Sequence, residues 1–423
     1  MTKKFIVILS FLLLACHFIN AQPILNKAYK SSIKTVQCHK QDWPLSYPII
    51  NLNGSDRLQL SFDDLVGETK DYYYSIIHCN QHWEPSQLME TEYANGINEV
   101  PLLDYTYSFN TSIDYVHYKL IFPNNDLSPL ISGNYVIKVY ENANDDNTVL
   151  TQRFMVTEQL VNVIPQVKYT MNSDLRKAKQ EIDLTILHPN FEMSNPLSDV
   201  KVSILQNGRT DNAITQLKPQ FIKQNELVYN YNRETMFEGG NEFRWLDLRS
   251  IRFQSSKIKD ISFHDPYSHV ELFPDRILAG QSYFFNNDFN GRYVIEIQEK
   301  DEPEIEADYV FVHFALPQAE PFVGGDVHIL GGLTGWQFTD ESKMEYNFNF
   351  KQYEASMLLK QGFYNYQFAF KPNNLEEASV SMFEGSHSKA ENDYLILVYY
   401  SGMGDYYDRI IGISQVNSVS NRQ

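Results

Sequence analysis

The sequence predicts an all-β protein made of three tandem β-sandwich domains of the immunoglobulin-like or early-set type. Three observations lead to this prediction. Apolar and polar residues alternate with a period of two along many short segments, turn-forming residues separate these segments, and 14% of the residues are aromatic. Alternation is typical of strands with one buried face. Aromatic side chains fit a pleated, half-buried surface, so their abundance also favours strands.

The first 21 residues have the layout of a secretory signal peptide. Two lysines precede an apolar run over residues 5–15, and a short polar stretch leads to Ala21. We expect cleavage between Ala21 and Gln22. The alternative is lipidation of Cys16, which lies in a lipobox-like context. No later window holds 18 consecutive apolar residues, so the sequence predicts an exported protein without a membrane-spanning helix.

Residues 22–158 are expected to form the first β-sandwich. Leu58, Leu60 and Phe62 alternate with polar neighbours, as in a strand that buries one face. Turn-forming sequences such as Asn53-Gly54 separate the strands. The other strand-like segments of this domain are residues 72–79, 115–122 and 135–140.

Residues 159–316 and 317–423 are expected to form a middle and a C-terminal β-sandwich, the latter early-set-like. Proline and a change of pattern suggest linkers at residues 157–165 and 316–323. The strand-like segments of the middle domain are residues 182–186, 200–204, 293–297 and 307–314, and those of the C-terminal domain are residues 327–330, 353–359, 363–370 and 394–400.

Cys38 and Cys79 are the cysteines that remain after the expected cleavage. An even pair in an oxidising compartment can form a disulfide, and two separate buried thiols are the alternative. Two cysteines in a chain of this length exclude a disulfide-dense scaffold. Burial of apolar surface must hold the cores together.

The sequence contains no recognisable catalytic or cofactor motif. Gly-x-Ser-x-Gly, His-Glu-x-x-His and the phosphate-binding Gly-Lys-Ser/Thr loop are all missing. His78, Cys79 and His82 lie close together, but a closed zinc site needs four ligands, usually as two separated pairs. The acidic loop at residues 142–147 lacks the glycine and the closing glutamate of a calcium loop. We therefore predict no enzyme activity, no metal and no cofactor.

The net charge of the chain limits its partners. Fifty-three acidic residues against 35 basic ones give a formal charge of −18. Such a chain is repelled by the phosphate backbone, which excludes nucleic acid as the expected partner.

A glycine-rich segment with Trp336 suggests an alternative function. Gly331, Gly332 and Trp336 precede two strand-like segments in an order that resembles the early-set sandwich of glycogen-binding modules. In those modules exposed aromatic rings stack on sugars, so a periplasmic glycan-binding protein is the alternative function. The other interpretation of Trp336 is a core residue. An outer-membrane β-barrel is disfavoured, because its strands would run through about 10 residues.

Several segments resemble the family of type IX secretion plug proteins. In the first domain these are residues 72–83 (YYYSIIHCNQHW), 105–118 (YTYSFNTSIDYVHY) and 132–140 (SGNYVIKVY). Near the end they are residues 360–366 (KQGFYNY) and 391–400 (ENDYLILVYY). The likeness extends over nearly the whole chain after the signal peptide.

This resemblance implies a periplasmic protein that is peripherally associated with the outer membrane. Its expected partner is the outer-membrane type IX translocon barrel, whose periplasmic opening a plug would seal between transport events. It implies no catalysed reaction and no catalytic or binding residues. We expect exposed tyrosines on the loops of one domain to supply the contacts, because tyrosine tolerates exposure and still packs well at interfaces.

Overall fold

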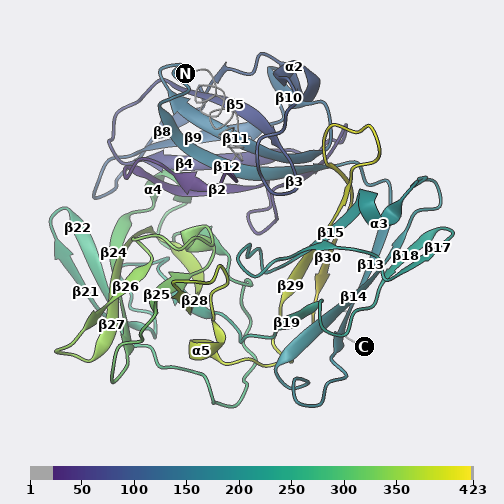
Figure 1. Ribbon diagram of the computed structural model, residues 1–423. Coiled ribbons are helices and arrows are strands. Elements are labelled where there is room, and N and C mark those ends of the chain that lie inside the picture. The colour runs from purple at the N-terminus through teal and green to yellow at the C-terminus, as the bar shows by residue number, and fades with distance from the viewer. Residues whose placement is uncertain (1–21, 421–423) are drawn as a thin grey trace, which may run out of the picture.

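The computed structural model describes residues 22–420 (Figure 1). The predicted cleavage site at Ala21 and the alternative lipidation site at Cys16 lie outside the described residues, and Gln22 is the first residue within them. The fold is mostly β, with 46% of residues in strands and 5% in helices, arranged in several antiparallel sheets. No helix among residues 22–420 is both long enough and apolar enough to cross a membrane.

Residues 22–158 form what we name the N-terminal unit, at the top of Figure 1. Two sheets face each other across one core, which Phe62, Tyr118 and Tyr135 help to fill. A two-stranded ribbon and the short helix α2 (Glu90–Tyr93) lie beside them. The first sheet contains β1 (Lys27–Ala28), β12 (Thr148–Thr157), β11 (Gly133–Glu141), β5 (Tyr72–Cys79), β7 (Val100–Pro101) and β3 (Ile49–Asn51). The second contains β2 (Ile33–Lys40), β4 (Leu58–Asp64), β9 (Val116–Phe122) and β8 (Tyr105–Tyr107), and the ribbon contains β6 (Ala94–Gly96) and β10 (Leu127–Pro129).

The middle unit consists of residues 159–241 and 389–420. Its two sheets also share one core, and the last two strands of the chain belong to it. One sheet contains β13 (Asn162–Tyr169), β14 (Lys179–Leu187), β18 (Glu226–Tyr229), β17 (Phe221–Lys223) and β19 (Met236–Glu238). The other contains β16 (Ile214–Leu217), β15 (Val200–Gln206), β29 (Asp393–Tyr400) and β30 (Arg409–Asn417), with α3 (Pro196–Asp199) before β15.

The third unit, residues 242–388, is one nine-stranded sheet that curls into a half-barrel. Its concave side encloses a core of its own. In order across the sheet the strands are β20 (Arg244–Asp247), β28 (Gly362–Pro372), β25 (Gly325–Leu330), β26 (Lys343–Asn347), β27 (Gln352–Lys360), β24 (Tyr309–Pro317), β22 (Tyr267–Leu272) and β21 (Ile258–His264). β23 (Tyr293–Ile295) pairs with β28, and the short helices are α4 (Pro303–Glu306), η1 (Gly332–Thr334) and α5 (Ser381–Glu384).

The boundary expected at residues 316/317 does not separate the sheets. β29 pairs with β15 along seven residues, so the end of the chain completes the middle unit. β20 and β24 pair with β28 and β27, so residues before the boundary complete the third unit. The chain therefore leaves the middle unit, builds the third unit and returns.

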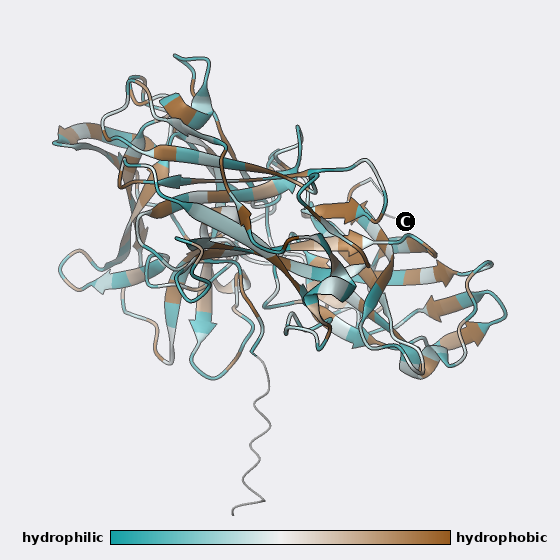
Figure 2. Cartoon of the chain, turned by 90° about the horizontal axis from the view of Figure 1, so that it is seen from above, coloured by the Kyte–Doolittle hydropathy of each residue, from teal (hydrophilic) through white to brown (hydrophobic). Residues whose placement is uncertain are grey.

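The predicted strands themselves are confirmed. The segment at residues 72–79 is β5, and the segments at residues 353–359 and 394–400 lie within β27 and β29. Figure 2 shows hydrophobic and hydrophilic residues alternating along many strands. Period-two patterning locates strands well, because successive side chains point to opposite faces of a sheet.

Candidate functional site

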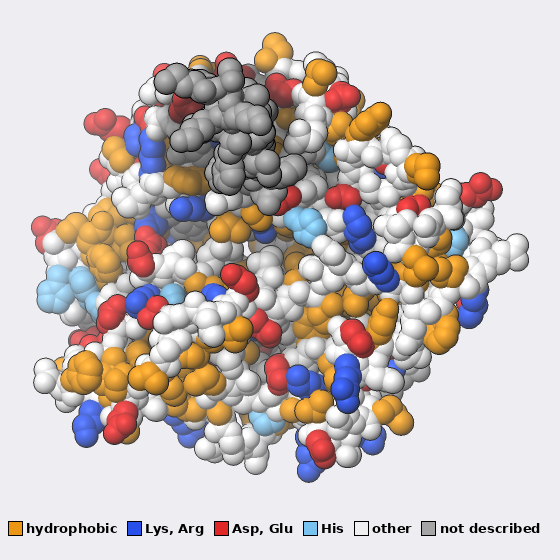
Figure 3. Space-filling model, in the orientation of Figure 1, with side chains coloured by type: hydrophobic (Ala, Val, Ile, Leu, Met, Phe, Trp, Pro, Cys, Tyr) orange, Lys and Arg blue, Asp and Glu red, His pale blue; other side chains and the backbone are white. Residues whose placement is uncertain are grey.

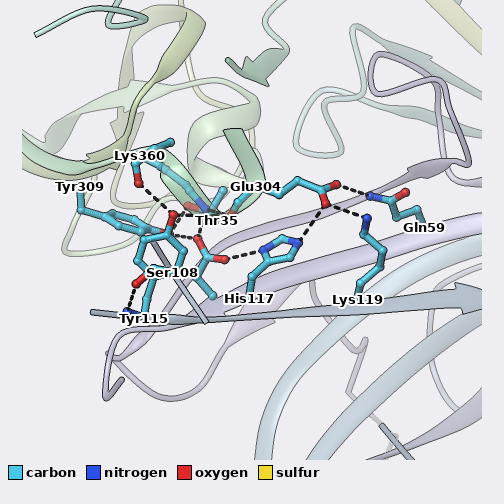
Figure 4. Close-up of polar contacts among 11 residues, drawn as sticks. Thr35, Gln59, Ser108, Tyr115, His117, Lys119, Glu304, Tyr309 and Lys360 are labelled. Carbon is cyan, nitrogen blue, oxygen red and sulfur yellow. Dashed lines mark hydrogen bonds and ion pairs between the residues drawn. The ribbon is translucent and has the colours of Figure 1, made fainter. Parts of the chain in front are cut away.

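The clearest polar cluster lies at the junction of the N-terminal and third units (Figure 4). Asp63 on β4 is its centre. The Asp63 carboxylate accepts hydrogen bonds from Lys360 Nζ at 2.6 Å and from the Tyr309 hydroxyl at 2.6 Å. Its other oxygen lies 2.7 Å from His117 Nδ1. Lys360 and Asp63 are both 1% exposed, so this ion pair is shielded from water.

Strand alternation explains how these polar groups reach the junction. Leu58, Leu60 and Phe62 of β4 point into the core of the N-terminal unit. Asp63 and Gln59 belong to the opposite face, and that face meets the third unit rather than solvent. The polar face of β4 is therefore a contact between units.

The helix α4 extends the same junction. Glu304 of α4 accepts hydrogen bonds from Lys119 Nζ at 2.7 Å and from Gln59 Nε2 at 3.2 Å. The Tyr115 hydroxyl donates to the carbonyl oxygen of Ala307 at 2.9 Å. We name this set of contacts, together with the Asp63–Lys360 pair, the polar seam.

The charges of the polar seam make its stability depend on pH. Burial alone would raise the pKa of Asp63, but Lys360 and the hydrogen bond from His117 hold it below its ordinary value. A carboxyl group whose pKa is lower in the folded state stabilises that state above its unfolded pKa, near 4. This contribution is lost as the pH falls through the folded pKa, so acid weakens the seam.

The junction of the N-terminal and middle units is apolar. Leu395, Leu397 and Tyr399 of β29 pack with Ile49 and Met155 of the N-terminal unit. The alternate residues of β29 face the core of the middle unit, so this strand is buried on both sides. We name this junction the apolar seam.

Polar contacts surround the apolar seam. Arg409 makes a bidentate ion pair with Glu158, with the closer oxygen at 2.6 Å, and the Tyr399 hydroxyl donates to Asn134 Oδ1 at 3.1 Å. Burial would raise the pKa of Glu158, yet Arg409 holds it below its ordinary value. The bidentate pair adds a directional contact at the edge of the apolar seam.

Polar contacts also join the middle and third units. Arg292 pairs with Asp393 at 2.9 Å, and Arg209 donates to the carbonyl oxygen of Ala378 at 3.0 Å. With the polar and apolar seams, this third junction connects each unit to both others. The protein is a closed triangle of units rather than a string.

The two cysteines singled out from the sequence lie in different sheets. Cys38 is on β2 and Cys79 is on β5, and both are free thiols in the structure. Burial raises the pKa of each thiol to about 12. Both thiols are therefore protonated and unreactive at neutral pH.

The other residues of interest from the sequence have structural surroundings. The buried His78 ring contacts Tyr135 and Tyr407, while His82 lies 3.1 Å from Gln216. Among residues 22–420 no group of three or more histidine, cysteine or acidic side chains is placed to hold a metal ion. Trp336 is half-buried, its ring lies edge-on to Phe243, and it lines a cavity together with residues of the other two units.

The exposed aromatic residues include many phenylalanines besides tyrosines. The largest fully buried side chains are mostly tyrosines, whereas exposed phenylalanines are numerous on the third unit. Figure 3 shows hydrophobic side chains over the lower left, where Figure 1 places β21, β26 and β27. The exposed phenylalanines of this unit are Phe253, Phe263, Phe273, Phe284, Phe285, Phe348 and Phe350.

One row of exposed apolar side chains does include tyrosines. Leu103, Tyr105, Tyr107 and Phe109 follow each other at every second position, and they are 45–76% exposed. Tyr105 and Tyr107 belong to β8, which is the edge strand of its sheet. We name these four residues the β8 stripe. Edge strands with exposed apolar side chains are typical contact surfaces for another protein.

Comparison with known proteins identifies the family of the first domain. The sequence model for the first domain of the type 9 secretion system plug protein matches residues 33–158. No curated protein matches the chain. The structure is similar to the crystal structure of a hypothetical protein from Parabacteroides merdae ATCC 43184, with a TM-score of 0.91 and 36% sequence identity over 93% of this chain and 99% of the other. Residues 33–158 of the chain therefore form the first domain of the type 9 secretion system plug protein family.

Proposed function

We propose that this protein is a non-catalytic plug that seals the periplasmic opening of the type IX translocon in the outer membrane between transport events. Family membership carries the proposal. The protein acts from the periplasm, after removal of residues 1–21, and it associates with the outer-membrane barrel as a peripheral partner.

The arrangement of the three units supports a sealing role. A plug must keep its shape against a pore, and three units that each contact both others resist bending more than units joined by single linkers. The shielded Asp63–Lys360 pair and the two-sided burial of β29 fix two of these contacts. We propose that the three units behave as one rigid body, with immunoglobulin-like N-terminal and middle units and an early-set-like third unit.

The β8 stripe is proposed as a surface that contacts the barrel. Release between transport events requires a reversible interface, which favours a modest patch with tyrosines at its centre. The glycan-binding alternative has less support, since it rests on the half-buried Trp336 alone.

A pull-down of the outer-membrane complex tests the plug proposal. The protein carries a C-terminal tag, the membrane is extracted in mild detergent, and the co-purifying proteins are identified. We expect the large type IX barrel to co-purify. If the barrel is missing while the tagged protein is recovered intact, the proposal fails.

A pair of double variants tests the β8 stripe. Tyr105→Ala with Tyr107→Ala is expected to reduce recovery of the barrel about tenfold or more, since interface tyrosines are frequent hot spots. Phe348→Ala with Phe350→Ala is the matched control, because it also removes two exposed aromatic rings from one strand end. If only the control variant fails to recover the barrel, the contact surface lies on the third unit and not on the β8 stripe.

A further inference from the structure

A cavity of about 470 Å³ lies where the three units meet. Its size falls within the range of small-molecule binding sites. Each unit supplies part of the wall, including Trp83 from the N-terminal unit, Leu397 from the middle unit and Trp336 from the third. The lining is largely apolar and aromatic, and neither the plug function nor the family requires such a cavity.

Two tryptophans of the cavity have an unusual backbone conformation. Trp83 has a φ of 65° and Trp336 a φ of 60°. A left-handed conformation is rare for a bulky residue, and it persists only where the surrounding structure imposes it. Gly291 gives Trp336 the necessary room, because a Cβ atom at Gly291 would lie 2.4 Å from the indole ring. The fold thus holds two indole rings at the same cavity in a disfavoured conformation.

Arg153 supplies a positive charge that no carboxylate neutralises. Its side chain is on β12, is 9% exposed, and stacks on Trp83 with the guanidinium 4.5 Å from the ring centre. Nε donates to the carbonyl oxygen of Ile24 at 2.6 Å. Its two Nη groups donate to no side chain or carbonyl within residues 22–420, and no acidic group of that range lies within ion-pair distance.

The second arginine of the cavity is different. Arg292 lies over the Tyr47 ring and is already paired with Asp393 at 2.9 Å. Burial lowers the pKa of Arg153 to about 10, so Arg153 still carries its charge at neutral pH. A buried, unpaired charge is unfavourable, and a bound anion would relieve it. Among residues 22–420, the cavity therefore offers one unmatched cation within apolar walls.

We propose that this cavity binds a small amphipathic carboxylate. The carboxylate pairs with the free Nη groups of Arg153, whose planar fork matches two carboxylate oxygens. The apolar part of the ligand lies against Trp83, Trp336 and Leu397. A single free cation fits one negative charge, which favours a carboxylate over a doubly charged phosphate.

Two probes represent the two sources of such a carboxylate. Dodecanoate, used below its micelle concentration, stands for a free fatty acid, and N-acetyl-leucyl-phenylalanine stands for a peptide C-terminus. Dodecanol and the C-terminal amide of the same peptide are their neutral counterparts. Titration calorimetry and tryptophan fluorescence measure binding to the protein that begins at Gln22.

We expect at least one carboxylate to bind with a stoichiometry of one. Its neutral counterpart should bind about tenfold more weakly or not at all, because a charged hydrogen bond is lost. The probe that binds identifies the source. The proposal is wrong if neither carboxylate binds at millimolar concentration, or if the neutral counterparts bind equally well.

Variants assign the binding to the cavity. Arg153→Gln should weaken binding about tenfold or more, while Arg153→Lys, which keeps the charge without the planar fork, should weaken it less. Arg249→Gln is the matched control, since Arg249 pairs with Asp247 away from the cavity. Trp83→Phe should reduce both affinity and the fluorescence change. Unchanged affinity in a folded Arg153→Gln or Arg153→Lys protein would overturn the proposal.

Discussion

The polar seam and the apolar seam join the same N-terminal unit to its two neighbours by opposite means. In the polar seam, Asp63 and Lys360 are buried as charges that must meet in one geometry. In the apolar seam, Leu395 and Leu397 pack without directional contacts. Ion pairs specify orientation but contribute little net stability, whereas apolar burial stabilises without specifying orientation. The polar seam therefore specifies how the N-terminal and third units are oriented. The apolar seam stabilises the contact between the N-terminal and middle units.

The largest loss in the free energy of unfolding is expected when one charge of the polar seam is removed. Lys360→Met leaves Asp63 buried without a cation and also removes the ammonium from the face of Tyr115. Breaking a buried pair in this way costs about 3–5 kcal/mol. The measurement is the free energy of unfolding from urea titration.

Lys119→Met is the control for the polar seam. Lys119 pairs with the partly exposed Glu304, and such pairs contribute about 0–1 kcal/mol. Equal losses for the two variants would show that the Asp63–Lys360 pair is no stronger than a surface pair, and the contrast between the seams would fail.

Truncation of one leucine probes the apolar seam. Leu397→Ala should lower the free energy of unfolding by about 3 kcal/mol, since it removes buried methyl groups and leaves a cavity. Leu375→Ala, at a leucine that is 57% exposed, should change it by less than about 0.5 kcal/mol. Added salt should leave the effect of Leu397→Ala unchanged. A salt-dependent effect would contradict the apolar character of this seam.

A smaller effect concerns pH at the junction of the middle and third units. Burial raises the pKa of Glu242 to about 7, despite the hydrogen bond from Tyr283. Its folded pKa exceeds its unfolded value near 4.3, so it favours the folded state at low pH and loses this contribution as the pH rises to about 7. The folded protein should therefore lose stability between pH 5 and pH 8, and Glu242→Gln should reduce this loss by about 2–3 kcal/mol.

Thermal or urea unfolding at both pH values checks this prediction. Asp63 in the polar seam affects stability in the opposite direction. Its pKa is lowered, so its contribution to stability is lost in acid. If the stability of the Glu242→Gln protein depends on pH as that of the parent does, Glu242 is not the group responsible for the pH dependence. Glu271→Gln is the control, at an exposed acidic residue on the outer part of the third unit.

The strands could be predicted from the sequence, but their assignment to sheets could not. Alternation at residues 58–62 located β4, yet it could not tell whether the polar face meets water or another unit. One signal was available. The run Tyr-Leu-Ile-Leu-Val-Tyr-Tyr at residues 394–400 is apolar at every position, which is typical of a strand buried on both faces.

The candidate sites were harder to predict than the strands. Asp63 and Lys360 are 297 residues apart, and nothing in a single sequence pairs them. The sequence singled out Trp336, but not its position beside Trp83 and Arg153. These residues line one cavity only because the three units pack against one another. Long-range placement of this kind is decided by packing between units, which local patterns do not record.

The return of the chain into the middle unit has a consequence for biogenesis. A polypeptide that emerges from its N-terminus can complete the N-terminal unit early, because residues 22–158 contain all of its strands. The middle unit forms later, since β15 lacks its neighbour β29 until residues 393–400 have emerged. An unpaired strand edge of this kind is prone to aggregate, so the incomplete chain is more exposed to misfolding than the complete one.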